Sequence, residues 1–137
     1  MPTKRSTPLE LEYRLLVTPQ YDEYRQRTTT LLLLQTVQYF ASFRYELSVD
    51  TNIQGKSIRM IVRGLKAPSL SLPAHGHAYY RHELENLRGT YELNIEGLDG
   101  RVNTFSIRVS EKKVQLLKEP REKFVQLIVN PELWPSS

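Results

Sequence analysis

Cysteine is absent from the 137-residue chain. This absence excludes a disulfide framework, a thiolate nucleophile and a zinc site built on cysteine ligands. Long apolar runs are also absent: the longest is the four leucines from Leu31 to Leu34, and a membrane-spanning helix needs roughly 20 apolar residues. The N-terminus is basic, but no apolar segment of the kind found in signal peptides follows it. We therefore expect no membrane insertion and a cytoplasmic location.

Catalytic patterns are missing as well. No serine lies in a Gly-x-Ser-x-Gly turn, and no glycine-rich loop is suited to hold a phosphate. Glutamate pairs such as Glu83 and Glu85 fall on strand faces that we expect to be solvated, whereas acid–base catalysis needs a carboxyl group whose pKa is shifted by burial. The sequence therefore predicts a non-catalytic protein without a cofactor, with a divalent metal as the alternative discussed below.

The composition is that of one globular domain with its own core, because 39% of the residues are hydrophobic and 25% are charged. The net charge is +4, from 19 basic and 15 acidic residues. Most arginines stand singly near a glutamate, a pattern typical of a solubilising surface and unfavourable for nucleic-acid binding. An anion or nucleic-acid binder that uses Lys4, Arg5, Arg59 and Arg63 remains an alternative hypothesis.

Apolar and polar residues alternate over most of the chain, which indicates β-strands with one buried face. Residues 43–49 and 58–63, joined by an Asn- and Gly-containing loop at 51–55, predict a hairpin. A second hairpin is predicted at 91–109 around Asp99-Gly100, a dipeptide that favours tight turns. Further strands are expected at 9–15, where Pro19 would end the strand, and at 112–117 and 124–129. Any strand at 70–72 would lie on an edge, because Pro68 and Pro73 flank it.

Two segments are compatible with either strand or helix. In residues 20–42, the three threonines before Leu31 favour a buried strand, although Leu31, Leu34 and Val37 would also share one face of a helix capped by Asp22. Residues 78–88 alternate like a strand, and they also carry a helical spacing that Gly89 would end. We expect a strand in 20–42, with a short helix as the alternative, whereas a strand and a short helix both stay open for 78–88.

Residues 84–95 read Leu-Glu-Asn-Leu-Arg-Gly-Thr-Tyr-Glu-Leu-Asn-Ile. Together with the strand that follows, to about residue 109, this segment resembles the E–F corner of immunoglobulin-like and fibronectin type III-like β-sandwiches. In those folds a tyrosine returns its hydroxyl to the backbone upstream. The resemblance implies that Tyr91 is the corner residue, that Leu84 and Leu87 pack against it, and that Leu93 and Ile95 face the core. It implies an antiparallel two-sheet sandwich but no particular function.

All three histidines fall between His75 and His82. On a strand, His75 and His77 would share a face, where two neutral imidazoles can bind one divalent ion. Glu83 is the candidate third ligand. The segment is similar to the first motif of the cupin barrels, although Glu83 comes later than that motif requires and no histidine follows His82. A small metal- or ligand-binding β-barrel is therefore an alternative hypothesis.

Aromatic and apolar residues supply the candidate contacts with other proteins. Tyrosine is enriched at interfaces because it offers a large contact area and a polar tip. Tyr21, Tyr24 and Arg25, in an expected loop, form one candidate patch. Near the C-terminus, Phe124, Leu127 and Trp134 belong to a segment too apolar to remain in water, so it either completes the domain's own sheet or pairs with another subunit.

The expected organisation is a flexible basic tail at 1–8, a sandwich domain at 9–118 and a C-terminal extension at 119–137 that packs on the sheet or on a partner subunit. The function predicted first is a non-catalytic β-sandwich that binds other proteins or self-associates.

Overall fold

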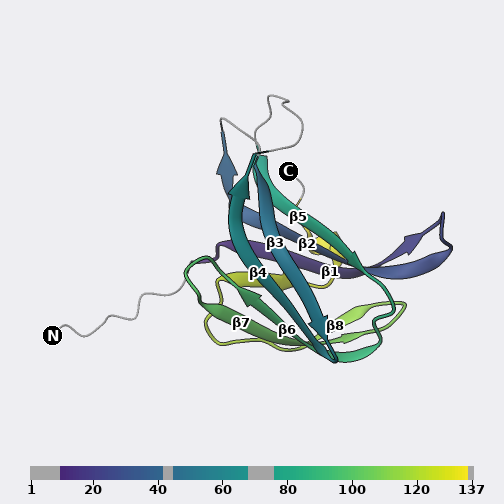
Figure 1. The fold of residues 1–137 in the computed structure, drawn as a ribbon. Helices are drawn as coiled ribbons and strands as arrows, with labels where there is room; N and C mark the ends of the chain where they lie inside the picture. The colour runs from purple at the N-terminus through teal and green to yellow at the C-terminus, as the bar shows by residue number, and fades with distance from the viewer. Residues whose placement is uncertain (1–9, 42–44, 68–75, 136–137) are drawn as a thin grey trace.

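The computed structural model describes residues 10–41, 45–67 and 76–135, which form one sheet of nine strands (Figure 1). A 3-10 turn, η1 (Pro131–Leu133), follows the last strand, and no α-helix occurs in these ranges. The protein is mainly β, as expected. The strands are β1 (Tyr13–Asp22), β2 (Arg27–Phe40), β3 (Glu46–Gln54), β4 (Ser57–Lys66), β5 (Gly76–Leu84), β6 (Gly89–Glu96), β7 (Val102–Val109), β8 (Val114–Lys118) and β9 (Val125–Ile128).

The strand order across the sheet is β8-β7-β6-β4-β3-β5-β2-β1-β9. The pairs β1–β2, β2–β5, β3–β4, β6–β7 and β7–β8 are antiparallel, whereas β3–β5, β4–β6 and β1–β9 are parallel. The structure thus shows one continuous mixed sheet instead of the two antiparallel sheets expected for an immunoglobulin-like sandwich. Alternation of apolar residues specifies each strand's buried face but not its neighbours, and the β4–β6 and β3–β5 pairings join segments that a sandwich would keep apart.

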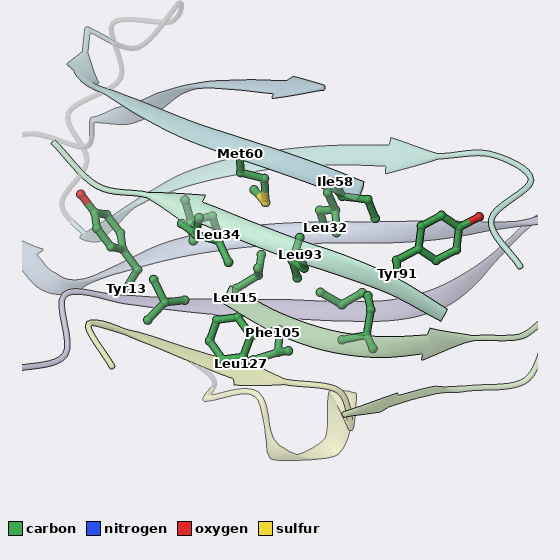
Figure 2. Close-up of a cluster of buried hydrophobic side chains, with 14 of the residues drawn as sticks. Tyr13, Leu15, Leu32, Leu34, Ile58, Met60, Tyr91, Leu93, Phe105 and Leu127 are labelled. Carbon is green, nitrogen blue, oxygen red and sulfur yellow. The ribbon is translucent and has the colours of Figure 1, made fainter. Parts of the chain in front are cut away.

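The sheet curls into a half-barrel around its core (Figure 1). The main core cluster takes buried side chains from all nine strands, so the strands at the two ends of the sheet order enclose the same interior. Figure 2 shows leucines, Ile58, Met60 and Phe105 gathered between the strands, with Tyr13 at one end and Tyr91 at the other. Burial of apolar area on one face of every strand is the main stabilising term for such a fold.

The corner contact expected at Tyr91 is present. The Tyr91 hydroxyl accepts a hydrogen bond from the backbone N–H of Arg88 at 3.1 Å. Leu84 and Leu87 are buried beside it, and Leu93 and Ile95 are fully buried in the core. The local geometry predicted for this segment therefore occurs within a half-barrel.

Both ambiguous segments are strands. Residues 20–42 contain the end of β1, a turn and all of β2, and residues 78–88 contain most of β5. Gly89 begins β6 and does not end a helix. The strand prediction is confirmed for 20–42, where Thr29 and Thr30 and the leucines that follow pack on the two faces of a long β2. Of the two alternatives left open for 78–88, the strand is the one that occurs.

β1 continues through Pro19 to Asp22, so the expectation that Pro19 ends this strand is wrong. β9 pairs with β1 only from Tyr13 to Leu16. The Tyr13 N–H donates to Phe124 O on that side, at 3.1 Å, and alternation directs the backbone of Pro19 to the same edge. Past the end of β9, no strand of the described residues lies along this edge of β1 to accept a hydrogen bond from residue 19. A proline, which has no N–H to donate, is therefore tolerated there.

The first predicted hairpin is confirmed as β3–β4, but its turn lies later than expected. Gln54 pairs with Ser57, so the turn is Gly55-Lys56 and residues 51–54 belong to β3. Gly55 has φ 58°, a conformation that favours glycine. The second hairpin is confirmed as β6–β7, and β8 and β9 correspond to the strands expected at 112–117 and 124–129. The strand expected at 70–72 and the tail at 1–8 lie outside the described residues.

The C-terminal strand is held in the half-barrel by a buried side chain. Asn103, on β7, is 3% exposed. Its Oδ1 accepts from the N–H groups of Phe124 and Val125 at 2.9 and 3.0 Å, and its Nδ2 donates to Glu122 O at 3.0 Å. These bonds link β7 to the segment that enters β9, where no backbone ladder joins the two strands. Within the described residues, part of the expected extension at 119–137 is therefore a strand of the same sheet.

Candidate binding groove

The residues predicted to form the first contact patch lie at the tip of the β1–β2 hairpin, which projects from the sheet (Figure 1). Tyr21 is 58% exposed and Tyr24 fully exposed. The Asp22 carboxylate accepts from the N–H groups of Tyr24 and Arg25, which fixes the turn. Arg25 also pairs with Glu85 at 3.3 Å. The tip is thus an exposed, ordered turn, and its role in binding stays a prediction.

The C-terminal residues predicted as contacts pack against their own chain. Phe124 is 1% exposed and Leu127 is 8% exposed, both within the main core. Trp134 packs on the outer face of the sheet against a small second cluster of Leu16, Leu31 and Ile128. Within the described residues, this segment therefore completes its own sheet. A further contact with another subunit stays a prediction.

Of the predicted metal ligands, His77 and Glu83 both lie on β5, and His75 lies outside the described residues. Glu83 lies six positions after His77 along the strand, which places them about 20 Å apart. These two side chains therefore do not share one ion. Glu83 instead accepts from Thr29 Oγ1 at 2.9 Å and pairs with Arg81. No group of three His, Asp or Glu side chains that could hold a metal occurs among the described residues.

His77 has a structural role that the sequence did not reveal. β2 bulges opposite β5, because Gln35 pairs with Tyr79 and Tyr39 with His77. The carbonyl oxygens of Thr36 and Gln38, freed by this bulge, lie 2.8 and 3.2 Å from His77 Nδ1. Since carbonyl oxygens only accept, Nδ1 carries the proton and holds the bulge in place.

The arginines of the anion-binding hypothesis are paired with carboxylates. Arg59 lies 2.7 Å from Glu96, and Arg63 lies 2.8 Å from Asp50. Lys4 and Arg5 lie outside the described residues. A polar hollow of about 470 Å³ beside Arg59 is lined mostly by amides and hydroxyls. Asn94 in this hollow already bonds to Ser57, Glu92 and Thr104.

A partly apolar concave surface lies at one open end of the half-barrel, and we call it the mouth groove. Its volume is about 470 Å³, within the range typical of binding clefts. Leu47 lies buried at its floor, while Leu11, Leu65 and Leu98 stand 40%, 45% and 64% exposed. The lining residues are Glu10, Leu11, Glu12, Tyr13, Thr36, Val37, Gln38, Phe40, Leu47, Gly64, Leu65 and Leu98.

Two β-bulges shape the mouth groove. The β2 bulge brings Val37 and Gln38 into its wall, and Val37 N–H donates to Glu12 O at 2.9 Å. On the opposite wall, the register of β3 and β4 shifts between Ser48 and Val49, next to Gly64. Gly64 has φ 144°, which favours glycine, and it precedes the exposed Leu65. Such bulges are common at barrel rims, where they redirect side chains.

The third wall is a turn that presents an exposed leucine. Leu98 lies between β6 and β7, in a turn closed by a 2.8 Å bond from Gly97 N–H to Arg101 O. Asp99 accepts from the N–H of Arg101, which also lowers the pKa of that carboxyl. A side chain at position 97 would come within 3.1 Å of the Phe124 ring, so the turn is fixed against the core. This ordered turn therefore keeps the Leu98 side chain exposed to solvent.

Tyr13 supplies a polar group at the base of the groove. Its ring is buried, and Figure 2 shows its hydroxyl pointing away from the core cluster. The hydroxyl has no hydrogen-bond partner among the described residues, unlike that of Tyr91 at the other end of the core. Burial raises the pKa of Tyr13, and the carboxylates of Glu12 and Asp99 raise it further. The hydroxyl therefore stays protonated as a hydrogen-bond donor at neutral pH.

The raised pKa of Tyr13 predicts how stability changes at alkaline pH. A phenol whose pKa is higher in the folded state contributes stability below the unfolded pKa of about 10, and this contribution is lost as pH rises through the folded pKa. We expect Tyr13→Phe to keep the unfolding free energy at pH 7 within about 0.5 kcal/mol and to lose less stability above pH 10. Denaturant unfolding from pH 7 to 11 measures this, with the exposed Tyr24→Phe as control. Parallel curves for wild type and Tyr13→Phe would contradict it.

Sequence reasoning missed the mouth groove. Its walls come from β1, β2, β3, β4 and the β6–β7 turn, which are distant in sequence and meet only through the strand order. The one available signal was Leu98, a large apolar residue between Gly97 and Asp99-Gly100, where turns usually carry polar residues.

Comparisons with protein-family models, with curated proteins and with solved structures found no match. The geometry of the mouth groove is therefore the basis for the function proposed below. Within the described residues, no helix combines the length and apolar character that crossing a membrane requires.

Proposed function

We propose that this chain is a non-catalytic protein-binding domain, and that the mouth groove receives an apolar side chain from a segment of a partner protein. The observation that supports the proposal is the gathering of Leu11, Leu65 and Leu98, all substantially exposed, around one concave surface. Exposed apolar side chains scattered singly need no explanation, but a contiguous group around a groove marks a binding surface.

A protein segment fits this groove better than a small molecule does. Small-molecule sites usually bury most of the ligand's surface. Here the leucines extend outward on the rim, so the apolar surface continues beyond the hollow. A peptide can place one side chain inside and cover the rim with its backbone and neighbouring residues. The Tyr13 hydroxyl offers a hydrogen bond at the base of the groove. This bond would orient the bound segment, in addition to the contact area that the apolar walls provide.

Selection from a phage-displayed library of short random peptides tests the proposal. We expect enriched peptides to share a large apolar residue, and their affinity to fall about tenfold in Leu65→Ser and in Leu98→Ser, because each rim leucine is buried by the bound peptide. Leu117→Ser is the matched control, since Leu117 is 45% exposed like Leu65 but lies on β8. All three sites are exposed, so folding should be unaffected.

Two results would refute a protein-binding role for the groove. One is the absence of any enriched peptide. The other is a set of peptides whose affinity is lowered equally by the control Leu117→Ser or not at all by the two rim variants. Binding of a neutral apolar dye such as Nile red that Leu98→Ser abolishes, without any peptide binding, would indicate a small-molecule site instead.

A further inference from the structure

The rim of the mouth groove is acidic in a protein that is basic overall. The chain carries a net charge of +4, yet the described residues that line the groove include Glu10 and Glu12 and no lysine, arginine or histidine. Asp99 lies in the turn that presents Leu98. This local excess of carboxylates opposes the overall charge, so it is a feature of the groove and not of the whole surface.

The carboxylates differ in what they already bind. Arg101 lies between Glu12 and Asp99, pairing with Glu12 at 2.6 Å and with Asp99 in the turn. The single Arg101 guanidinium thus forms ion pairs with both carboxylates. Glu10 is exposed and forms no ion pair with any described residue. A negative charge therefore remains available at the rim, next to the exposed Leu11.

We infer that the segment recognised by the mouth groove carries a lysine or arginine beside its apolar residue, with the cation at Glu10. This inference rests on the proposed function, because it names the chemistry of the partner for the same site. The apolar walls take the side chain, and the free carboxylate attracts the adjacent cation. Complementary charge of this kind raises the association rate and excludes acidic segments.

The experiment uses the full chain and the peptides enriched by the selection above. We expect the consensus to include lysine or arginine within two positions of the apolar residue. Glu10→Lys should weaken binding about threefold to tenfold, and raising the salt concentration from roughly 0.05 M to 0.5 M should weaken wild-type binding similarly. Glu23→Lys is the matched control, because Glu23 is also exposed and without an ion pair among the described residues, at the distant hairpin tip.

The outcomes separate this inference from the proposed function. Peptides that share an apolar residue but no cation, and that bind Glu10→Lys as well as wild type, overturn the inference and leave the function intact. An equal loss in Glu23→Lys also overturns it, because the effect would then follow net charge. If neither Leu65→Ser nor Leu98→Ser weakens the binding of any peptide, both the proposed function and this inference are refuted. A concentration-dependent dimer in light scattering that Leu98→Ser dissociates would name a second copy as the occupant and overturn the inference.

Discussion

Phe124→Ala is expected to lower the free energy of unfolding by about 3–5 kcal/mol. Phe124 is among the largest fully buried side chains, although it lies in the connection between the edge strands β8 and β9. Its ring lies edge-on to Tyr13, with 6.4 Å between centroids, and the Arg101 guanidinium lies 5.1 Å from its centroid. Because Gly97 lies directly against it, the cavity left by alanine has rigid backbone on one side and collapses poorly.

Chemical denaturation followed by circular dichroism measures this change. Tyr24→Ala is the control, because it removes an aromatic ring that is fully exposed and should change the free energy by less than about 0.5 kcal/mol. A loss below about 1 kcal/mol for Phe124→Ala would show that the C-terminal segment is not part of the core.

Asn103→Ala is expected to cost about 3–4 kcal/mol, which is large for removing a single polar side chain. The substitution leaves the N–H groups of Phe124 and Val125 and the carbonyl of Glu122 without their partner. Each unsatisfied buried group costs about 1–3 kcal/mol, with the lower values where water can enter. Since this side chain replaces a backbone ladder between β7 and β9, its loss should also loosen β9.

Hydrogen exchange distinguishes loosening of β9 from general destabilisation. In Asn103→Ala, the amide of Ile128, which faces β1, should lose more protection than those of Leu93 and Ile95 in β6. Asn94→Ala is the control, because Asn94 forms its bonds with exposed side chains on the outer face. Equal stabilities for Asn103→Ala and Asn94→Ala would mean that Asn103 does not close the half-barrel.

The sequence predicts the individual strands well and their arrangement poorly. Alternation identifies both hairpins. The resemblance at residues 84–95 implies the Tyr91 corner, whose hydroxyl accepts from the N–H of Arg88. The parallel pairing of β4 with β6, however, depends on which strands become neighbours, and residues 57–61 and 92–96 carry no local signal for it. Pro19 shows the same limit. Whether this proline ends β1 depends on whether another strand pairs with that edge of β1, and only the strand order decides this.

The candidate sites show the same difference between features that follow from a local pattern and features that depend on the arrangement of the strands. Tyr24 was expected to be exposed because it lies in a local turn, and it is. Phe124 and Leu127 were recognised as too apolar for water, but the sequence leaves open which surface covers them. The mouth groove depends on two bulges and on a turn that meets β1 across the half-barrel. Bulges arise from register mismatches between paired strands, so a single strand's pattern does not reveal them.

The proposed function depends on the binding of a partner segment in the mouth groove. Titration of isotope-labelled protein with a selected peptide, followed by amide chemical shifts, tests it most directly. We expect the largest changes to fall on the amides of Leu11, Val37, Leu65 and Leu98, around Tyr13. Changes centred on Tyr21 and Tyr24 at the hairpin tip, with the groove amides unmoved, would contradict it.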